Sequence, residues 1–436
     1  MRTNELMLYK HMDYEKVLKD MTFLMENYYN SYYNIEDLRG LLFDCMNEIL
    51  EISTSHGFEG NLWHTYLTFL LANDENAYST SCEIVGKVKG SINTIAEHDF
   101  AIFKELFDYD FQPMENALKA ECLSVLFSYQ NGNNGGKIFN RRIRDRICDL
   151  SRSLGKAESI EAFQDKLTEF YKEFGVGKLG LHKAFRIEHE EGEKPSIVPI
   201  TNIAHVHLDD LVGYEIAKKK LIDNTKAFVE GRRANNCLLY GDAGTGKSSS
   251  IKAILNQYYD QGLRMIEVYK HQFQDLNDVI AQIKNRNYKF IIYMDDLSFE
   301  EFEIEYKYLK AVIEGGLERK PENVLIYATS NRRHLVRETF RDKADRDEEL
   351  HTNDTVQEKL SLVARFGVTI YFGSPDKKEF QKIVKELAKT NNITMAEEKL
   401  LLEANKWELS HGGMTGRTAQ QFIDYLLGQE QETIRN

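Results

Sequence analysis

Apolar residues recur at three- and four-residue steps through the first part of the chain, the spacing that places them on one side of an α-helix. One such stripe comprises Ile35, Leu38, Leu42, Cys45, Ile49 and Ile52. Asn34 stands before it where a helix cap is expected, and similar stripes run through 143–154 and 160–174. Glycines end both of these stripes, and we expect Gly155 to be a left-handed cap. Residues 1–187 are therefore predicted to form a mostly α-helical N-terminal domain.

From about His205 onward, short apolar runs alternate with amphipathic helical segments. The runs occupy residues 237–240, 265–269, 290–294, 324–328 and 368–372. Short strands that alternate with helices are typical of a parallel sheet with helices on both faces. The fold class predicted for residues 205–373 is therefore an α/β domain with a five-stranded parallel sheet.

The chain changes character on either side of this α/β domain. Residues 188–204 are charged, contain glycine and two prolines and lack periodicity, so we expect the domain linker there. No strand pattern follows the last apolar run. Ser374 and Pro375 indicate the start of a helix, because proline is well tolerated at the first helical position. Residues 374–436 are predicted to form a small helical lid.

Composition narrows the class of protein. Hydrophobic residues make up 42% and charged residues 29% of the 436 residues, the balance of a soluble globular protein. The net charge of -13 argues against non-specific nucleic-acid binding by the whole chain, because an acidic surface repels phosphates. The five cysteines show no zinc-binding spacing, and no stretch reaches the ~18 uninterrupted apolar residues of a membrane span. We expect a cytoplasmic protein without a membrane segment.

A glycine-rich pattern lies between the first predicted strand and the helix after it. It consists of Gly241, Asp242, Ala243, Gly244, Thr245, Gly246, Lys247 and Ser248, and Ser249 follows. The glycines let successive backbone N–H groups turn toward phosphates, and the helix adds its positive N-terminal end. Lys247 would supply a charge for the β- and γ-phosphates and Ser248 a hydroxyl ligand for Mg²⁺. Because a strand precedes it and a helix follows, the pattern predicts a nucleotide-binding P-loop rather than a chance glycine-rich turn.

Two carboxylates, Asp295 and Asp296, directly follow the third apolar run. Ligands of parallel sheets bind at the carboxyl ends of the strands, so both acids are expected beside the P-loop. Asp295 would orient Mg²⁺, and Asp296 would activate or position the attacking water. Asp296 could instead cap the next helix, and the two roles are compatible.

Together these features resemble the AAA+ superfamily of P-loop ATPases, and the resemblance implies roles for further residues. Asn331, after the fourth run, resembles the sensor-1 residue that helps to place the water. Arg365 resembles the arginine finger that reaches the γ-phosphate of a neighbouring subunit, and Arg417 resembles the sensor-2 arginine that closes the lid onto ATP. Val212 and Gly213 lie in a segment that resembles the one packing against adenine. The resemblance implies ATP and Mg²⁺ as cofactors and a homo-oligomer, as a ring or an open ring.

Each of these landmarks also has an ordinary structural interpretation. Asn331 can cap a strand-end turn, and Arg417 can be a solvated residue near the start of a helix. Arg365 can pair with Glu358 at the surface. The order and spacing of the landmarks along the chain favour the AAA+ interpretation.

The sequence around the landmarks is similar to a bacterial AAA+ ATP-binding family designated domain of unknown function 815. The similarity rests on residues 295–300, 328–335, 365–367 and 416–422. It implies ATP binding and no particular substrate. The chain departs from the wider superfamily at Asp296, where glutamate is usual, and the shorter carboxylate predicts slow hydrolysis.

Three other patterns have less specific interpretations. Residues 175–180 match the dinucleotide-binding fingerprint but follow a helix, so we expect a helix end and a mobile connection. The five arginines within 141–152 favour a solvated basic face, with nucleic-acid or partner contact as the alternative. The four tyrosines within 28–33 are expected in the core.

The leading hypothesis is an AAA+ ATPase that hydrolyses Mg-ATP between subunits to remodel or switch a protein partner bound by the helical N-terminal domain. An ATP-gated, nucleic-acid-associated loader or adaptor is one alternative. A slow-hydrolysing regulatory scaffold, suggested by Asp296, is the other.

Overall fold

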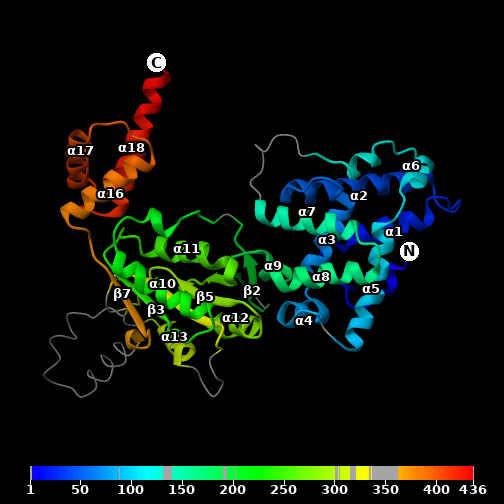
Figure 1. Cartoon of the computed structure of the whole chain (residues 1–436), viewed down its shortest axis with the longest axis horizontal. Helices are drawn as coiled ribbons and strands as arrows, with labels where there is room; N and C mark the ends of the chain where they lie inside the picture. Colours follow the sequence, from blue (N-terminus) through cyan, green and yellow to red (C-terminus); the bar gives the residue numbers. More distant parts are fainter. Residues whose placement is uncertain are drawn as a thin grey trace. The chain divides into compact units, whose positions relative to one another are not determined.

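The chain divides into two compact units, Met1–His182 and Lys183–Asn436. The computed structural model describes residues 2–87, 89–130, 140–189, 194–201, 203–299, 303, 305–314, 321–332, 335 and 362–435. The first unit is helical, and the second contains the sheet, the P-loop and the lid helices (Figure 1).

The first unit is built from α-helices around one hydrophobic core. They are α1 Glu15–Asn27, α2 Ile35–His56, α3 Leu62–Asn73, α4 Ala77–Val85, α5 Ser91–Phe107, α6 Gln112–Leu118, α7 Arg141–Gly155, α8 Ile160–Phe174 and α9 Gly177–Leu181, with 3-10 turns η1 Thr3–Glu5 and η2 Leu123–Phe127. Asn34 caps α2 as expected, because its side chain accepts a hydrogen bond of 3.0 Å from the backbone N–H of Glu36. Ten of the twelve residues of α3 are buried, so this helix lies within the core rather than at its surface.

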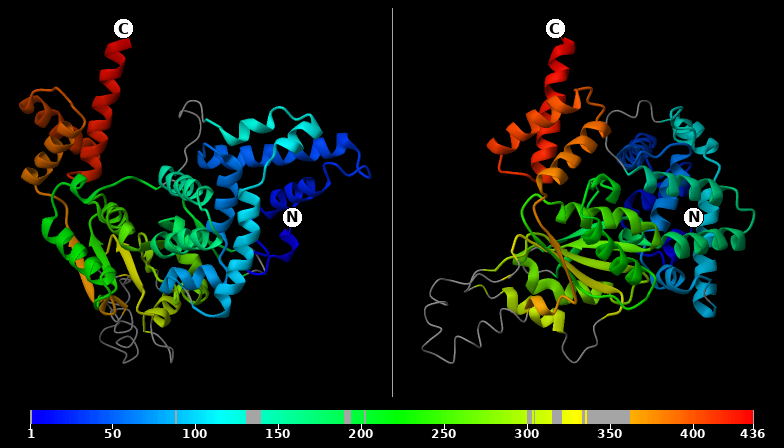
Figure 2. Two further views of the ribbon diagram at one scale, coloured as in Figure 1. Left: turned by 45° about the vertical axis from the view of Figure 1, so that its right-hand side comes forward. Right: turned by 60° about the vertical axis from the view of Figure 1, so that its left-hand side comes forward.

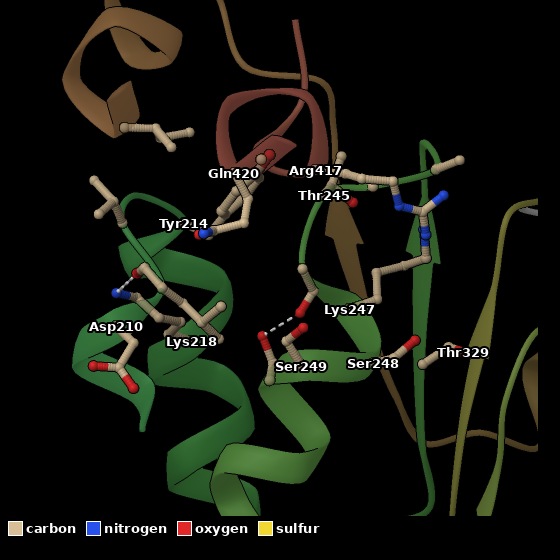
Figure 3. A pocket seen from close by; sticks show the side chains of 18 of the residues that line it. Asp210, Tyr214, Lys218, Thr245, Lys247, Ser248, Ser249, Thr329, Arg417 and Gln420 are labelled. Atoms are coloured by element: carbon tan, nitrogen blue, oxygen red, sulfur yellow. Dashed lines mark hydrogen bonds between the residues drawn. The ribbon is translucent and has the colours of Figure 1, made fainter. Parts of the chain in front are cut away.

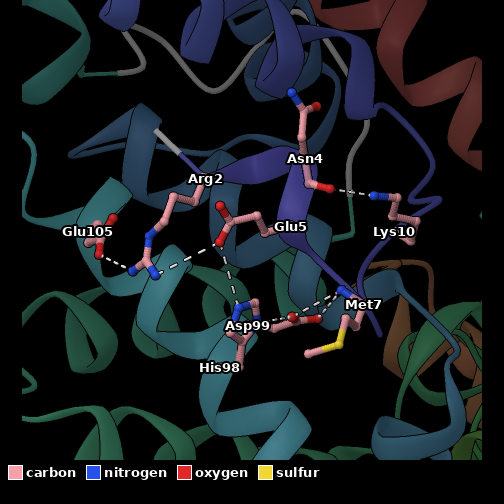
Figure 4. A network of polar contacts seen from close by, with 8 residues as sticks. All are labelled: Arg2, Asn4, Glu5, Met7, Lys10, His98, Asp99 and Glu105. Carbon is pink, nitrogen blue, oxygen red and sulfur yellow. Dashed lines mark hydrogen bonds and ion pairs between the residues drawn. The ribbon is translucent and has the colours of Figure 1, made fainter.

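A buried carboxylate on α5 fixes the N-terminal segment of this unit (Figure 4). Asp99 is 0% exposed and accepts hydrogen bonds from the backbone N–H groups of Met7, Leu8 and Tyr9 at 2.8–3.1 Å. Hydrogen bonds to an ionised acceptor are stronger than neutral ones. The side chain therefore stabilises the fold chiefly through the backbone of residues 7–9, and its Oδ1 also contacts Nδ1 of the neighbouring His98 at 3.1 Å.

Two expectations about glycines in this unit were wrong. Gly155 is the last residue of α7 and has no positive φ; a Cβ there would lie 3.0 Å from His64 Nδ1. The close approach of α3 explains this glycine, and no left-handed turn is involved. Residues 175–180 do end α8, but Gly177 and Gly180 are buried rather than in a mobile connection, and side chains there would overlap Glu75 and the Gly175 backbone.

The expectation that the tyrosines within 28–33 lie in the core was wrong for three of the four; Tyr28 is partly buried and packs against the core. Tyr29, Tyr32 and Tyr33 are 73%, 95% and 44% exposed. Their spacing suggested one face of a helix, but α1 ends at Asn27, so these residues lie in the turn before α2. We call Tyr29, Tyr32 and Tyr33 the tyrosine turn.

The second unit contains a seven-stranded sheet in the order β2-β1-β4-β5-β6-β3-β7. The strands are β1 Ala184–Glu188, β2 Ser196–Pro199, β3 Cys237–Gly241, β4 Leu263–Glu267, β5 Lys289–Met294, β6 Val324–Ser330 and β7 Val368–Phe372. All neighbouring pairs are parallel except β1 and β2, which are antiparallel. The AAA+ α/β fold class is confirmed with its five parallel strands, but the sheet also includes the hairpin β1–β2 along β4.

β2 lies in the region expected to be a linker, and β1 lies almost wholly in the last part of the expected helical N-terminal domain. β1 ends at Glu188 and β2 lies within 188–204, whereas the two units divide between His182 and Lys183. β1 is five and β2 four residues long, too short for either to show a clear sequence period. Pairing with β4 at the sheet edge, not local patterning, accounts for them. Residues 190–193 and 202 of the expected linker lie outside the described residues.

Helices cover the sheet on both faces. They are α10 Glu215–Val229, α11 Lys247–Tyr258, α12 Leu276–Ile283 and α13 Glu305–Glu314, with 3-10 turns η3 Leu208–Asp210, η4 Tyr259–Gln261 and η5 Lys270–Asp275. Leu239, Ile291 and Tyr327 share a core with α10 and α11. Alternate strand residues point to the opposite face, and there Leu238 and Ile292 are also 0% exposed. The P-loop strand β3 therefore lies in the sheet interior, between β6 and β7.

The lid is a bundle of three helices with its own apolar core (Figure 2). The helices are α16 Lys377–Thr390, α17 Glu397–Ser410 and α18 Gly416–Arg435. Phe380, Ala404 and Ile423, one from each helix, are 0% exposed. Val212, which precedes α10, packs against this core, so the lid contacts the segment expected beside adenine.

Candidate functional site

The P-loop connects β3 to α11 in a conformation that requires glycine. Gly241, Gly244 and Gly246 have φ values of 138°, 74° and 87°, which side chains other than glycine rarely adopt. A Cβ on Gly241 would overlap the carbonyl oxygen of Phe372 at the end of β7. The loop is therefore positioned by close backbone contact with the neighbouring strand, and α11 begins at Lys247 with its N-terminus at the loop.

Lys247 is almost entirely buried, at 6% exposure. Its ammonium donates hydrogen bonds to the carbonyl oxygens of Gly241 at 2.9 Å and Asp242 at 2.6 Å, and to Oδ1 of Asn331 at 3.0 Å. Burial lowers the pKa of Lys247 although nearby carboxylates, Asp296 foremost, oppose the shift. The lysine is thus held at the base of the loop by acceptors that a phosphate could replace.

Asp295 lies beside Ser248, as the sequence predicted for a metal pair. Oδ1 of Asp295 accepts hydrogen bonds from the Ser248 hydroxyl at 2.7 Å and from the Thr329 hydroxyl at 2.5 Å. Burial alone would raise the pKa of Asp295, but hydrogen bonds, first from Thr329 and then from Ser248, outweigh it and lower the pKa below its usual value. The carboxylate is therefore ionised at neutral pH.

Asp296 and Asn331 contact each other directly. The Asn331 amide donates to Oδ1 of Asp296 at 2.7 Å, and the Asp296 backbone N–H donates to the Thr329 hydroxyl at 2.9 Å. Asp296 has a φ of 48°, which is uncommon for a residue other than glycine and turns it away from the direction of β5. Among the described residues no helix starts at Asp296, and the next one, α13, begins at Glu305, so the helix-cap alternative is wrong in this part of the chain.

These groups line one side of a cavity of about 600 Å³. The cavity is lined by Asp210, Leu211, Val212, Tyr214, Lys218, 243–250, Asp295, Asp296, Thr329, Asn331, Ile383, Leu387, Gly416, Arg417, Gln420 and Gln421. Its volume lies in the range typical of small-molecule sites. Gly213, Gly241 and Asp242 belong to the same segments but do not line the cavity itself.

The lid closes the cavity opposite α11 (Figure 3). The backbone N–H of Arg417, at the start of α18, donates to the carbonyl of Gly244 at 3.2 Å. Any Cβ on Gly244 would lie 3.1 Å from the Arg417 Cβ, so the glycine also permits this contact. Arg417 therefore comes to the P-loop as predicted, from an element about 170 residues away in sequence.

Several lining residues were missed from the sequence. Tyr214 and Lys218 come from the α10 side, and Gln420 from α18 (Figure 3). The Lys218 ammonium donates to the carbonyl of Leu211 at 2.8 Å, which shapes the segment before α10. Spacing from the P-loop gives no signal for them; the pattern of small and polar residues after Gly416 could have indicated Gln420.

Arg365 lies away from this cavity. It precedes β7, and the parallel register pairs Phe372, at the other end of that strand, with Gly241. Five strand residues span about 16 Å. Arg365 therefore lies near the amino ends of the strands, whereas the phosphate-binding loop lies at their carboxyl ends. It forms an ion pair with Glu314, the last residue of α13. The alternative partner Glu358 lies outside the described residues.

The donor set suits Mg²⁺, although it contains few protein ligands. Ser248 and Asp295 offer oxygen atoms side by side, and Mg²⁺ usually keeps several waters and uses one or two carboxylates together with substrate phosphates. In the described part of the chain no group of three or more His, Cys, Asp or Glu residues could hold a metal by itself. The site therefore fits a metal that arrives with a nucleotide.

The arginines of α7 are partly neutralised within their own helix. Arg144 pairs with Asp145 and Arg152 with Asp149, and Arg146 lies over the ring of Phe174 at 4.1 Å. These contacts favour the solvated basic face over a nucleic-acid interface.

Residues 181–430 match the family described as "Protein of unknown function (DUF815)". The chain belongs to this family. Its DUF815 region includes the whole cavity and the lid core. No protein of curated function matches the sequence.

Two solved structures are similar to parts of this DUF815 chain. A RuvB mutant from Thermotoga maritima is 16% identical, with a TM-score of 0.35 over 50% of this chain and 64% of that one. The chain therefore spans less than two thirds of that relative. The FIGL-1 AAA domain in complex with ADP is 15% identical, with a TM-score of 0.36 over 53% of this chain and 76% of that one. The AAA+ assignment here rests on the P-loop, the sheet and the lid. Among the described residues, no helix has the length and apolarity needed to cross a membrane.

Proposed function

We propose that this chain binds Mg-ATP in the cavity and hydrolyses it between subunits of a homo-oligomer. One observation carries the proposal: two chains of hydrogen bonds meet below the P-loop. One runs from Lys247 through Asn331 to Asp296, and the other from Ser248 through Asp295 to Thr329. A P-loop used only for structure would not need a lysine and two carboxylates beside a cavity.

Each residue has a separate task in this proposal. Lys247 and the loop N–H groups would bind the phosphates. The ionised carboxylate of Asp295 and the hydroxyl of Ser248 would hold Mg²⁺. Bound Mg²⁺ supplies positive charge that offsets the charge developing on the phosphates. Asp296 accepts a proton from, or orients, the attacking water, and Asn331 fixes the position of its carboxylate.

Asp296 reaches the site although it is shorter than the usual glutamate. Its left-handed backbone and the Thr329 bond to its N–H direct the carboxylate toward Asn331 and Lys247. We infer that this conformation replaces the missing methylene in part, so hydrolysis is slow but present.

The position of Arg365 supports completion of the site by a neighbour. Arg365 lies near the amino ends of the strands and the cavity lies at their carboxyl ends, so the arginine does not line the cavity of its own chain. In a ring or open ring, its ion pair with Glu314 would hold it at the subunit boundary, ready for a neighbouring γ-phosphate. The helical unit would bind the protein that is remodelled or switched, and the tyrosine turn offers exposed aromatic area of the kind enriched at interfaces.

Phosphate release from ATP, measured over a range of protein concentrations, tests the proposal. We expect turnover that requires Mg²⁺ and rises per subunit with concentration, and that is lost in Lys247→Ala and in Asp295→Asn. Asp223→Asn, which changes an exposed carboxylate on α10, is the matched control and should leave turnover unchanged. Absence of Mg²⁺-dependent turnover in the unaltered protein at every concentration would refute ATP hydrolysis.

A further inference from the structure

The connection between β7 and the lid is held at three consecutive residues. The carbonyl of Phe372 accepts a hydrogen bond from the Asp242 backbone N–H at 3.0 Å, and the carbonyl of Gly373 accepts one from the Tyr214 hydroxyl at 3.0 Å. The backbone N–H and the hydroxyl of Ser374 both donate to Oδ2 of Asp242, at 2.8 and 2.9 Å. We call residues 372–374 the lid connector. Asp242 supplies three of these four bonds.

Asp242 is the second residue of the P-loop, and its two polar ends face different elements. Its carboxylate holds Ser374, whereas its carbonyl oxygen accepts hydrogen bonds from Lys247 at 2.6 Å and from the Thr245 hydroxyl at 2.8 Å. The carboxylate does not line the cavity, so phosphate binding does not require it. If Asp242 only shaped the P-loop, its carboxylate would not need to bind Ser374 of the lid connector.

The lid touches the same loop a second time. Two residues beyond Asp242, the carbonyl of Gly244 accepts the backbone N–H of Arg417 at the start of α18. The first and last parts of the lid are therefore both attached within residues 242–244. Any change in the conformation of this short segment must alter the position of both attachments, because each bond is short and direct.

We propose that Asp242 is a positioning residue that couples the phosphate contacts of Lys247 to the orientation of the lid. The proposal rests on ATP binding at this site. When phosphate oxygens take over the donors of Lys247, the bond from Lys247 to the Asp242 carbonyl is weakened, and Asp242 transmits the change to Ser374. The lid then responds to the phosphates through the connector as well as through Arg417.

The chemistry of Asp242 suits this task. One ionised oxygen accepts both Ser374 bonds, and hydrogen bonds to a charged acceptor are short and directional. Those two bonds lower the pKa of Asp242, so the contact persists at neutral pH. Ser374 precedes Pro375, which restricts its backbone to extended conformations and keeps its N–H directed at the carboxylate.

Spin labels on the two sides of the connector test the proposal in the full chain. Lys219→Cys on α10 and Glu398→Cys on α17 are exposed labelling positions, used with Cys122→Ser and Cys148→Ser to remove the two accessible thiols. The distance distribution is measured with and without a non-hydrolysable ATP analogue. We expect the analogue to shift the distribution in this parent, and the shift to be clearly smaller in Asp242→Ala, where only the Arg417 contact with Gly244 remains.

Companion variants separate coupling from simple loss of structure. Asp242→Asn keeps an acceptor oxygen and should retain the shift, and Ser374→Ala keeps only the backbone bond and should retain part of it. Asp242→Ala should raise the Kd for the analogue about tenfold, the equivalent of one hydrogen bond to a charged group, and raise KM more than it lowers kcat. Asp223→Asn should change nothing.

Each outcome decides between the proposals. A full shift in Asp242→Ala, with the analogue bound, overturns the coupling role and leaves the ATPase proposal intact. Loss of the shift equally in Asp242→Asn and Asp242→Ala also overturns it, because the conservative variant should rescue. Failure of the parent to bind the analogue at all overturns ATP binding, and the coupling role with it.

Discussion

Lys247 and Asp99 are both charged side chains buried in this chain, and they differ in what surrounds them. Asp99 in the helical unit is satisfied by three consecutive backbone N–H groups, and its partners are fixed by the fold (Figure 4). Lys247 is bound by two carbonyls and a side-chain amide at the edge of a cavity (Figure 3). A buried charge with fixed backbone partners stabilises a fold, whereas one with exchangeable partners beside a cavity is suited to a ligand.

The strongest test of this contrast removes the charge on the cavity side. Lys247→Ala should lower ATP turnover on the order of 10²–10³-fold, the effect of losing one donor to a developing charge. Phosphate release at saturating Mg-ATP measures it. We expect no such loss of ATP turnover in Asp99→Asn in the helical unit. Equal losses of turnover in both variants would contradict the distinction between the two buried charges.

The second prediction concerns the atypical carboxylate. Asp296→Asn should lower kcat on the order of 10²-fold, because the amide cannot accept a proton from water, while binding of a fluorescent ATP analogue stays within about twofold. Phosphate release and analogue titration separate the two quantities. An unchanged kcat would show that Asp296 takes no part in the reaction and that another group positions the water. Asp296→Glu should be at least as active as the parent if reach limits hydrolysis.

A smaller effect is expected at Thr329, which lies in the segment that resembles sensor 1 but was given no role of its own from the sequence. Thr329→Val removes the hydroxyl that donates to Asp295 and accepts from the Asp296 N–H. We expect turnover to fall about tenfold, equivalent to ~1.4 kcal/mol. Thr390→Val, which removes an exposed hydroxyl that donates to the carbonyl of Glu386 within α16, is the control.

The same variant has a defined pH dependence. The hydrogen bonds hold the pKa of Asp295 below its usual 3.8, so its ionised form stabilises the fold at neutral pH and this contribution is lost as pH falls through the lowered pKa. Removing the Thr329 bond raises that pKa. The acid limb of the kcat/KM profile should therefore move to higher pH, and a shift to lower pH would contradict the assignment.

The smallest effect on activity is expected in the helical unit. Asp99→Asn should lower the free energy of unfolding by about 1–3 kcal/mol, because the amide cannot accept all the N–H groups of residues 7–9. ATP turnover per folded subunit should stay unchanged. Chemical denaturation followed by tyrosine fluorescence measures the first quantity. Asp108→Asn, at an exposed pair with Lys104, is the control and should cost less than about 0.5 kcal/mol.

The sequence predicted which polar residues lie around the P-loop, because phosphate binding demands particular residues at fixed backbone positions, but it missed lining residues from α10 and α18. Lys247, Ser248, Asp295 and Asn331 each follow a strand at the carboxyl edge, so the parallel sheet brings them together. Their separate catalytic roles stay predictions. Arg417 was found through resemblance, since nothing local to α18 indicates its contact with Gly244.

Features that depend on distant contacts escaped sequence reasoning. β1 and β2 form only because β4 offers an edge, and the bonds from Asp242 to Ser374 join residues 132 positions apart. In the helical unit, the spacing of the tyrosines wrongly predicted that the tyrosine turn lies in the core. Periodicity alone cannot show that α1 ends at Asn27. Gly155 likewise reflects the approach of His64 rather than a local turn.

We propose that the ATPase site of one subunit is completed by Arg365 of another, and mixing two inactive variants tests this arrangement. Arg365→Ala retains the P-loop and Lys247→Ala retains the arginine, so a mixed interface contains one intact site. Each variant alone should be inactive, with Arg365→Ala reduced on the order of 10³-fold, and Arg232→Ala, at an exposed pair with Glu230, should be unaffected. We predict that mixing the two inactive variants restores Mg²⁺-dependent phosphate release. Full activity of Arg365→Ala alone, or no recovery on mixing under conditions where the subunits associate, would contradict the account.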